Sequence, residues 1–129
     1  MPEPTSVSAS PISPGGSTVA FVHAGDYVNK LSGQRIEREC LLRLEGGCRA
    51  LVINFRGTEL VNSIGVSILL GVIEAAGERG ARVVFSSVNL HTAQLFDLLG
   101  LTRHVALADS DEDALATLEE FAAAAPQGH

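Results

Sequence analysis

The chain has 129 residues, 46% of them hydrophobic and 5% aromatic, which suits one domain with a core of aliphatic side chains. Its net charge is −6 and its nine basic residues are scattered, which argues against nucleic acid as a partner. No apolar run approaches the roughly 20 residues that span a bilayer and no secretory pattern opens the chain, so we expect a cytoplasmic protein without a membrane partner.

The two ends of the chain differ in composition from its middle. Residues 1–16 are rich in proline, serine and glycine, so we predict a disordered tail there. Residues 122–129 read as a fraying helix end followed by a Pro-Gln-Gly tail. The predicted folded domain therefore covers residues 17–121.

Strand and helix patterns alternate between the tails. In chain order we predict a strand at 18–22, a helix at about 31–44, a strand at 50–55, a helix at 64–79, a strand at 81–85, a helix at 90–99, a short strand at 103–107 and a last helix opening at 110–113. The near-continuous apolar run at 50–55 is typical of a central strand covered on both faces. This alternation predicts a single small α/β domain, with a mostly parallel central sheet and helices packed on it.

The sequence Asn62-Ser-Ile-Gly65 stands where the loop after the central strand meets the 64–79 helix. A helix N-terminus has unpaired backbone N–H groups and the positive end of the dipole, which suits a phosphate. Serine is also an ordinary N-cap residue. The residues alone therefore leave two interpretations of Ser63 open, a phosphorylation switch and a helix cap.

The 64–79 helix is apolar over most of its circumference. Val66 and Leu70 extend its apolar surface beyond the stripe that one sheet contact needs. Because a small chain cannot easily bury a helix on all sides, we expect a partner-facing edge that includes Val66 and Leu70. The same edge would serve equally for a homodimer.

Three loops are expected to meet near Ser63. Gly25-Asp26, the 56–61 loop and residues 86–89 each follow a predicted strand. In a mostly parallel sheet, ligands gather outside the carboxyl ends of the strands. These segments are either ordinary surface loops, or a composite partner surface or small-molecule sensing site.

Other chemistry has little support in the sequence. Cys40 and Cys48 form no CxxC motif and, with four scattered histidines, no metal-ligand set, so we expect structural thiols and no metal. No glycine-rich phosphate-binding motif is present, and we expect no cofactor. Catalysis with Ser63 as a nucleophile would need a distant histidine and an aspartate to converge on it, so we do not expect an enzyme.

The stretch Leu51-Val-Ile-Asn-Phe-Arg-Gly-Thr-Glu-Leu-Val-Asn-Ser-Ile-Gly-Val-Ser-Ile-Leu-Leu70 resembles the signature of the STAS family, to which the bacterial anti-sigma factor antagonists belong. That signature is an apolar strand, a short loop, and then Asp-Ser-x-Gly opening an apolar helix. Later pieces are similar too, and the resemblance covers roughly residues 18–120. It implies a small STAS-like α/β domain that regulates by binding.

The resemblance also implies a switch. In the phosphorylation-controlled members, the unmodified serine form binds an anti-sigma factor that is also a serine kinase, which frees the sigma factor. The kinase phosphorylates the serine, the complex dissociates, and a PP2C-type phosphatase restores the unmodified form. The matching serine here is Ser63, and Gly65 matches the glycine of the signature.

On this basis the expected partner-binding residues are those of the switch sequence, its helix and the first turn: Asn62, Ser63, Ile64, Gly65, Val66, Leu70, Gly25 and Asp26. One departure is Asn62, where the family usually has aspartate. The amide keeps the hydrogen-bonding capacity but removes a negative charge beside the hydroxyl. The alternative function is a ligand-sensing or scaffold STAS domain in a larger complex, with no phospho-switch.

Overall fold

The computed structural model describes residues 19–124, and the side chains of residues 19–120. Its elements are β1 (Val19–His23), β2 (Tyr27–Val28), α1 (Lys30–Glu45), β3 (Ala50–Asn54), β4 (Leu60–Val61), α2 (Ser63–Glu78), β5 (Arg82–Ser86), α3 (Leu90–Leu98), the 3-10 helix η1 (Leu101–Arg103), β6 (Ala106–Ala108) and α4 (Asp111–Ala124). The tail expected at residues 1–16 lies outside the described residues, as do residues 125–129. Helix α4 continues three residues past the domain end expected at residue 121.

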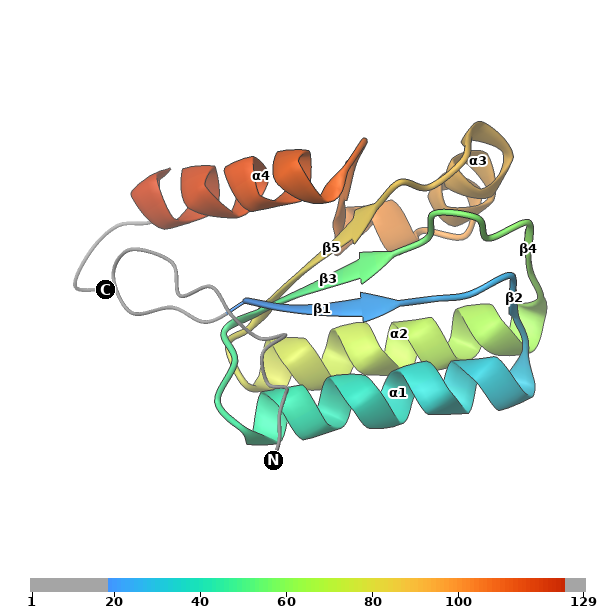
Figure 1. Cartoon of the computed structure of the whole chain (residues 1–129), viewed down its shortest axis with the longest axis horizontal. Helices are drawn as coiled ribbons and strands as arrows, with labels where there is room; N and C mark the ends of the chain where they lie inside the picture. The colour runs from blue at the N-terminus through green and yellow to red at the C-terminus, as the bar shows by residue number, and fades with distance from the viewer. Residues whose placement is uncertain (1–18, 125–129) are drawn as a thin grey trace, which may run out of the picture.

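The main sheet has four strands in the order β1-β3-β5-β6, and every neighbouring pair is parallel. Helices α1 and α2 lie side by side on one face of this sheet, and α4 covers the other face (Figure 1). The predicted α/β architecture with a parallel sheet is therefore confirmed. The last strand differs from the prediction, because residues 101–103 form η1 and the strand begins only at Ala106.

Strand β3 is buried along both of its faces, as its apolar run predicts. Leu51 and Ile53 pack into the core under α1 and α2, whereas Val52 packs into the core under α4. Three phenylalanines, Phe55, Phe85 and Phe96, close the first core at the carboxyl end of the strands, with ring centroids 4.9 to 5.5 Å apart. This aromatic cluster gives the loops above it a rigid base.

Helix α2 is covered by two neighbours, the sheet and α1. Val66 is only 6% exposed and belongs to the core. On another side of the helix, Ile68 meets Gly33 of α1 so closely that an added Cβ at Gly33 would lie 2.9 Å from the Ile68 Cδ1 atom. The expectation that Val66 lies on a partner-facing edge is therefore wrong, because the sheet and α1 together account for most of the apolar circumference.

Candidate functional site

A second, two-stranded sheet extends the loops that follow β1 and β3. Tyr27 pairs with Leu60 and Val28 pairs with Val61, in parallel register. These strands are too short to produce the alternating pattern by which strands are detected in a sequence, and the sequence analysis missed both. Their pairing places the Gly25-Asp26 turn beside the 56–61 loop, as expected from their positions after parallel strands.

Backbone hydrogen bonds continue this ladder on both sides. The Glu59 N–H donates to the Asp26 carbonyl at 2.8 Å, and the Asn62 N–H donates to the Val28 carbonyl at 2.9 Å. The ladder therefore runs from Asp26 up to the residue before α2. It joins the first turn of α2 to the end of β2.

Thr58 ties a third loop to the first two. Its side chain is only 3% exposed, and its hydroxyl donates to the Gly25 carbonyl. The Thr58 carbonyl accepts a hydrogen bond of 3.0 Å from the Asn89 side-chain amide. Asn89 is also the N-cap of α3, accepting from the Thr92 N–H at 2.7 Å. The sequence analysis did not single out Thr58, since nothing in a loop sequence marks one threonine as buried.

Helix α2 is capped by Asn62. Its side-chain oxygen accepts from the Gly65 N–H at 2.8 Å, and its backbone is extended, with φ −88° and ψ 175°. The interpretation of Ser63 as a helix cap is therefore wrong, because Ser63 is the first residue inside the helix. Asparagine and aspartate can both cap a helix at this position, because each has a side-chain oxygen that accepts from the backbone.

The Ser63 side chain is exposed, and it is not used to stabilise the fold. Among residues 19–120, the Ser63 hydroxyl forms no hydrogen bond, whereas the serine of a catalytic triad is hydrogen-bonded to its histidine. It stands at the positive end of the α2 dipole. What this arrangement offers is an accessible hydroxyl on a fixed backbone.

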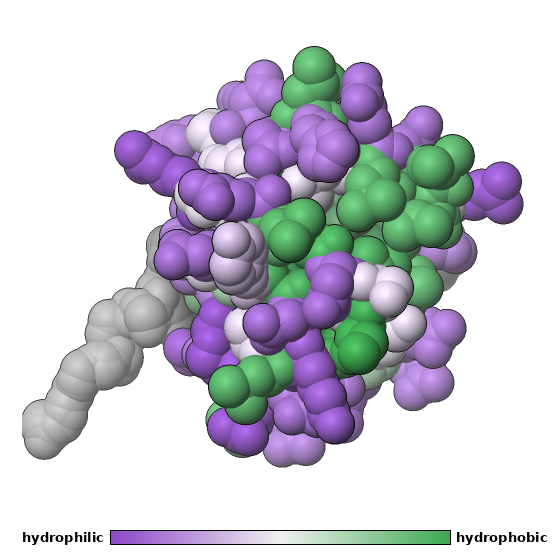
Figure 2. Space-filling model, turned by 90° about the vertical axis from the view of Figure 1, so that its right-hand side faces the viewer, coloured by the Kyte–Doolittle hydropathy of each residue, from purple (hydrophilic) through white to green (hydrophobic). Residues whose placement is uncertain are grey.

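Exposed apolar side chains lie on the strands β2 and β4 that lead to α2 and on the first turn of α2 itself. Tyr27 and Leu60 are each 53% exposed on the short sheet, and Ile64 is 50% exposed beside Ser63. We call these four residues, Tyr27, Leu60, Ser63 and Ile64, the Ser63 surface. It lies at the right of Figure 1, where β2, β4 and the first turn of α2 meet, and Figure 2 shows apolar side chains gathered on that side among hydrophilic ones. An apolar centre with a polar rim is typical of protein–protein interfaces.

The other predicted partner-binding residues differ in their accessibility. Asp26 is exposed, and Gly25 is half-buried with φ +94°, a left-handed conformation that favours glycine. Gly65 is buried against β2. Leu70 is half-buried, two turns beyond Ser63 along α2.

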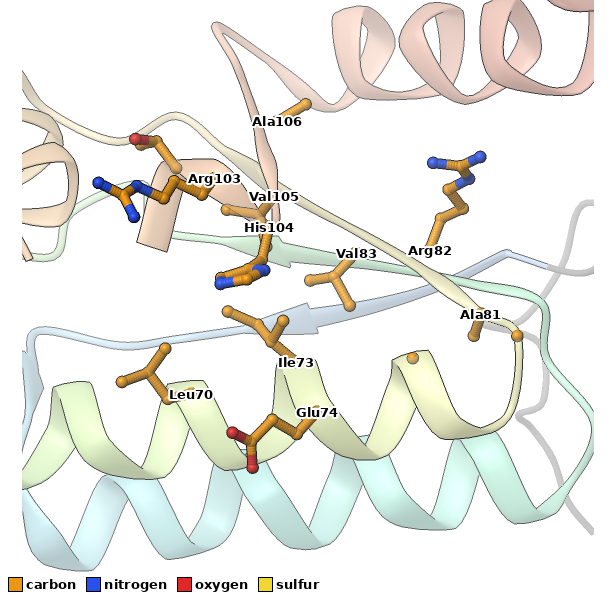
Figure 3. A pocket seen from close by; sticks show the side chains of 13 residues that line it. Leu70, Ile73, Glu74, Ala81, Arg82, Val83, Arg103, His104, Val105 and Ala106 are labelled. Carbon is orange, nitrogen blue, oxygen red and sulfur yellow. The ribbon is translucent and has the colours of Figure 1, made fainter. Parts of the chain in front are cut away.

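Leu70 and Ile73 line a groove of about 850 Å³ between α2 and the η1–β6 segment. His104 points into this groove toward Ile73, whereas Arg82 points away from it (Figure 3). Its charged and polar side chains do not converge on one point, as those of a built ligand site do. The groove is separate from the loops that carry Tyr27 and Leu60.

A polar cluster on the α4 side holds that helix to the sheet. The Asp111 carboxylate accepts from the Asn54 side-chain amide at 2.9 Å and from the Ser86 hydroxyl at 2.7 Å. Asn54 and Ser86 are the last residues of β3 and β5, and Ser86 is fully buried. These bonds fix the first residue of α4 over the ends of the two central strands.

The cysteines are free and buried. Burial, with Glu39 nearby, raises the pKa of the Cys40 thiol to about 12, and burial also raises the pKa of Cys48. Such thiols are poor nucleophiles. Within residues 19–120, no cluster of histidine, cysteine and carboxylate side chains is suited to a metal ion. None of the helices between residues 19 and 124 has the length and apolar character to cross a membrane.

Comparison with known proteins matches this chain to one protein family. The model of the STAS domain matches residues 19–114. The chain is 24% identical over 97 residues to an anti-sigma F factor antagonist of Paenibacillus polymyxa, an alignment that covers 75% of this chain and 77% of that protein.

Solved structures share the fold. A sulfate transporter family protein of Wolinella succinogenes superposes with a TM-score of 0.71 at 16% identity, over 81% of this chain and 88% of that one. The phosphorylated form of the Bacillus cell fate determinant SpoIIAA superposes with a TM-score of 0.61 at 14% identity, over 85% of this chain and 96% of that one. At these identities the likeness concerns the fold alone.

Proposed function

Because the chain belongs to the STAS domain family, we propose that it is a non-enzymatic anti-sigma factor antagonist that acts by partner switching under the control of Ser63 phosphorylation. The main support is the position of Ser63, an exposed hydroxyl at the start of α2 that the fold itself does not use. The similarity to an anti-sigma F factor antagonist points to the same role. Its partners would be an anti-sigma factor with serine kinase activity and a PP2C-type phosphatase, in the cytoplasm.

The Ser63 surface has the properties that such a switch needs. In the unmodified protein, Leu60 and Ile64 offer half-exposed apolar side chains to a partner. A phosphoryl group on Ser63 would add a charge of about −1.5 to −2 to the same surface. Burying that charge without a paired cation costs several kcal/mol, and a loss of about 2.7 kcal/mol already lowers affinity a hundredfold.

The same phosphate would leave the fold intact. Ser63 is exposed, so added atoms meet solvent rather than the core. The helix dipole favours negative charge at this end, and Asn62 places no carboxylate beside the hydroxyl. The phosphorylated and unmodified forms would therefore share one structure and differ in the surface that they present.

The test is mass spectrometry of the protein isolated from its own cells across growth and stress conditions, with a phosphatase-treated control. One phosphate mapped to Ser63 that phosphatase removes is the expected result. A protein that stays unmodified at Ser63 in all conditions would contradict the phospho-switch.

A second candidate function is that of a ligand-sensing or scaffold STAS domain in a larger complex without a phospho-switch, for which the groove beside Leu70 supplies the volume but no converging set of polar groups. The volume of the groove, about 850 Å³, lies within the range of small-molecule sites. Native mass spectrometry of the same isolated protein separates the two functions. A bound small molecule together with an unmodified Ser63 would favour the second.

A further inference from the structure

The three loops that end β1, β3 and β5 are joined at one buried residue, Thr58. Its hydroxyl reaches the first loop at the Gly25 carbonyl, and its own carbonyl takes the Asn89 amide of the third. Its N–H donates to the Phe55 carbonyl at 2.9 Å, which closes the turn of the second loop. With only 3% of its surface exposed, Thr58 does not touch a partner itself.

Thr58 also stands at the beginning of the ladder that leads to Ser63. The next residue, Glu59, bonds to Asp26, Leu60 pairs with Tyr27, and Asn62 bonds to Val28. A two-residue strand pair is too short to hold its register by itself. The Thr58 hydroxyl supplies the bond that fixes the two segments at the end where the ladder starts.

We infer that Thr58 is a positioning residue for the Ser63 surface: its hydroxyl and carbonyl hold the three loops in the one arrangement that the kinase partner recognises. The inference rests on the proposed function for the partner and on the contacts of Thr58 for the mechanism. Without the hydroxyl, the Gly25 carbonyl loses its partner and the Tyr27 side of the surface can move relative to α2. Removing the buried Thr58 hydroxyl would then change the arrangement of exposed residues that Thr58 does not contact.

The experiment compares Thr58→Val, which removes the hydroxyl but keeps the branched shape, with Thr58→Ser, which keeps the hydroxyl. Thr92→Val is the matched control, because Thr92 is a similarly buried threonine whose hydroxyl makes no hydrogen bond within residues 19–120. The first measurement is amide hydrogen exchange at Glu59 and Asn62. The second is the initial rate of Ser63 phosphorylation, with an extract of the protein's own cells and labelled ATP as the probe.

We expect Thr58→Val to speed exchange at Glu59 and Asn62 about tenfold, the effect of losing one hydrogen bond, and to slow phosphorylation of Ser63. Thr58→Ser and Thr92→Val should resemble the wild type in both measurements. If Thr58→Val does not fold, Asn89→Asp takes its place, since aspartate keeps the cap of α3 but cannot donate to the Thr58 carbonyl.

Exchange that is unchanged in Thr58→Val, or equally fast in Thr58→Ser, would overturn the inference. Faster exchange with an unaltered phosphorylation rate would overturn the role of Thr58 in recognition. If the wild type is not phosphorylated at Ser63, the proposed function fails, whereas the exchange data still decide whether Thr58 holds the loops.

Discussion

Gly65 lies so close to the carbonyl group of Val28 that no side chain fits between them. A Cβ atom at Gly65 would collide with the Val28 carbonyl oxygen and would stand 2.9 Å from both its carbonyl carbon and its Cγ1 atom. The first turn of α2 is thus seated directly on β2. The Gly65 N–H also donates to the Asn62 side chain that caps the helix. Gly65 therefore determines how closely the first turn of α2, which includes Ser63, packs on β2.

Gly65→Ala should therefore destabilise the protein, although alanine is the better helix former. The added methyl group must displace backbone, and such overpacking costs about 1 to 3 kcal/mol. The matched control is Gly77→Ala on the same helix, where nothing lies within 4 Å of the added Cβ. That variant should gain about 0.5 to 1 kcal/mol. Urea unfolding of both variants measures the difference, and equal stabilities would contradict the close approach.

Under the proposed partner switch, Ser63→Asp should weaken binding to the kinase partner about a hundredfold or more, because a charge must be buried at the interface. Ser63→Ala should keep the affinity of the wild type. Ser67→Asp is the control for charge alone, since Ser67 is also exposed and lies one turn further along α2. Isothermal titration with the kinase measures all three. A similar loss in Ser63→Asp and Ser67→Asp would show that the site is not specific.

Asn62→Ala should cost about 1 kcal/mol of stability, because the Gly65 N–H loses its acceptor. Asn62→Asp should match or slightly exceed the wild type, since aspartate caps equally well and its charge suits the helix dipole. Thermal unfolding of the two variants checks this order. If alanine proved as stable as asparagine, the cap would not hold the start of α2.

Stability should fall in alkaline solution through Cys40. Its pKa is about 12 in the folded protein against 9.0 for a free thiol, so above pH 9 the unfolded chain releases a proton that the folded one retains. The stability that Cys40 contributes is essentially complete well below pH 9 and is lost as the pH rises toward 12, by about 1 to 2 kcal/mol at pH 10. Urea unfolding at pH 7.5 and pH 10 should show a smaller decline for Cys40→Ala than for the wild type. Equal declines would mean that Cys40 is accessible to solvent.

Asp111→Ala should lower the free energy that holds α4 on the sheet by about 2 to 3 kcal/mol, because the buried Ser86 hydroxyl and the Asn54 amide lose a charged acceptor. Glu112→Ala is the control, since Glu112 is an exposed carboxylate in the same first turn. Hydrogen exchange of the α4 amides should rise in the first variant only. A comparable rise in both would assign the effect to the helix dipole.

The sequence predicted what depends on long, regular patterns. The apolar run of β3 and the strand–helix alternation were sufficient for the parallel sheet and its two covered faces. The junction of loop and helix at Ser63 was also predicted to within one residue, although the cap is Asn62 and the helix begins at Ser63 rather than at Ile64. These signals are local, and local signals survive in a single sequence.

What the sequence could not predict depends on contacts between distant segments. The sequence of α2 does not show that α1 packs on it at Ile68, where Gly33 lies. Without that contact, Val66 seemed to be surplus apolar surface, although it is buried in the core. The β2–β4 pair has two residues a strand, too few for any periodicity. Thr58 is ordinary in sequence, and its importance arises from the loops that surround it.

Strand β1 begins and helix α4 ends at the side of the molecule remote from the Ser63 surface (Figure 1). The described polypeptide therefore enters and leaves the domain on one side, while the exposed Ser63 hydroxyl lies on the opposite side. A linker, a reporter or a larger assembly fused at either end of the domain would therefore leave the Ser63 surface uncovered.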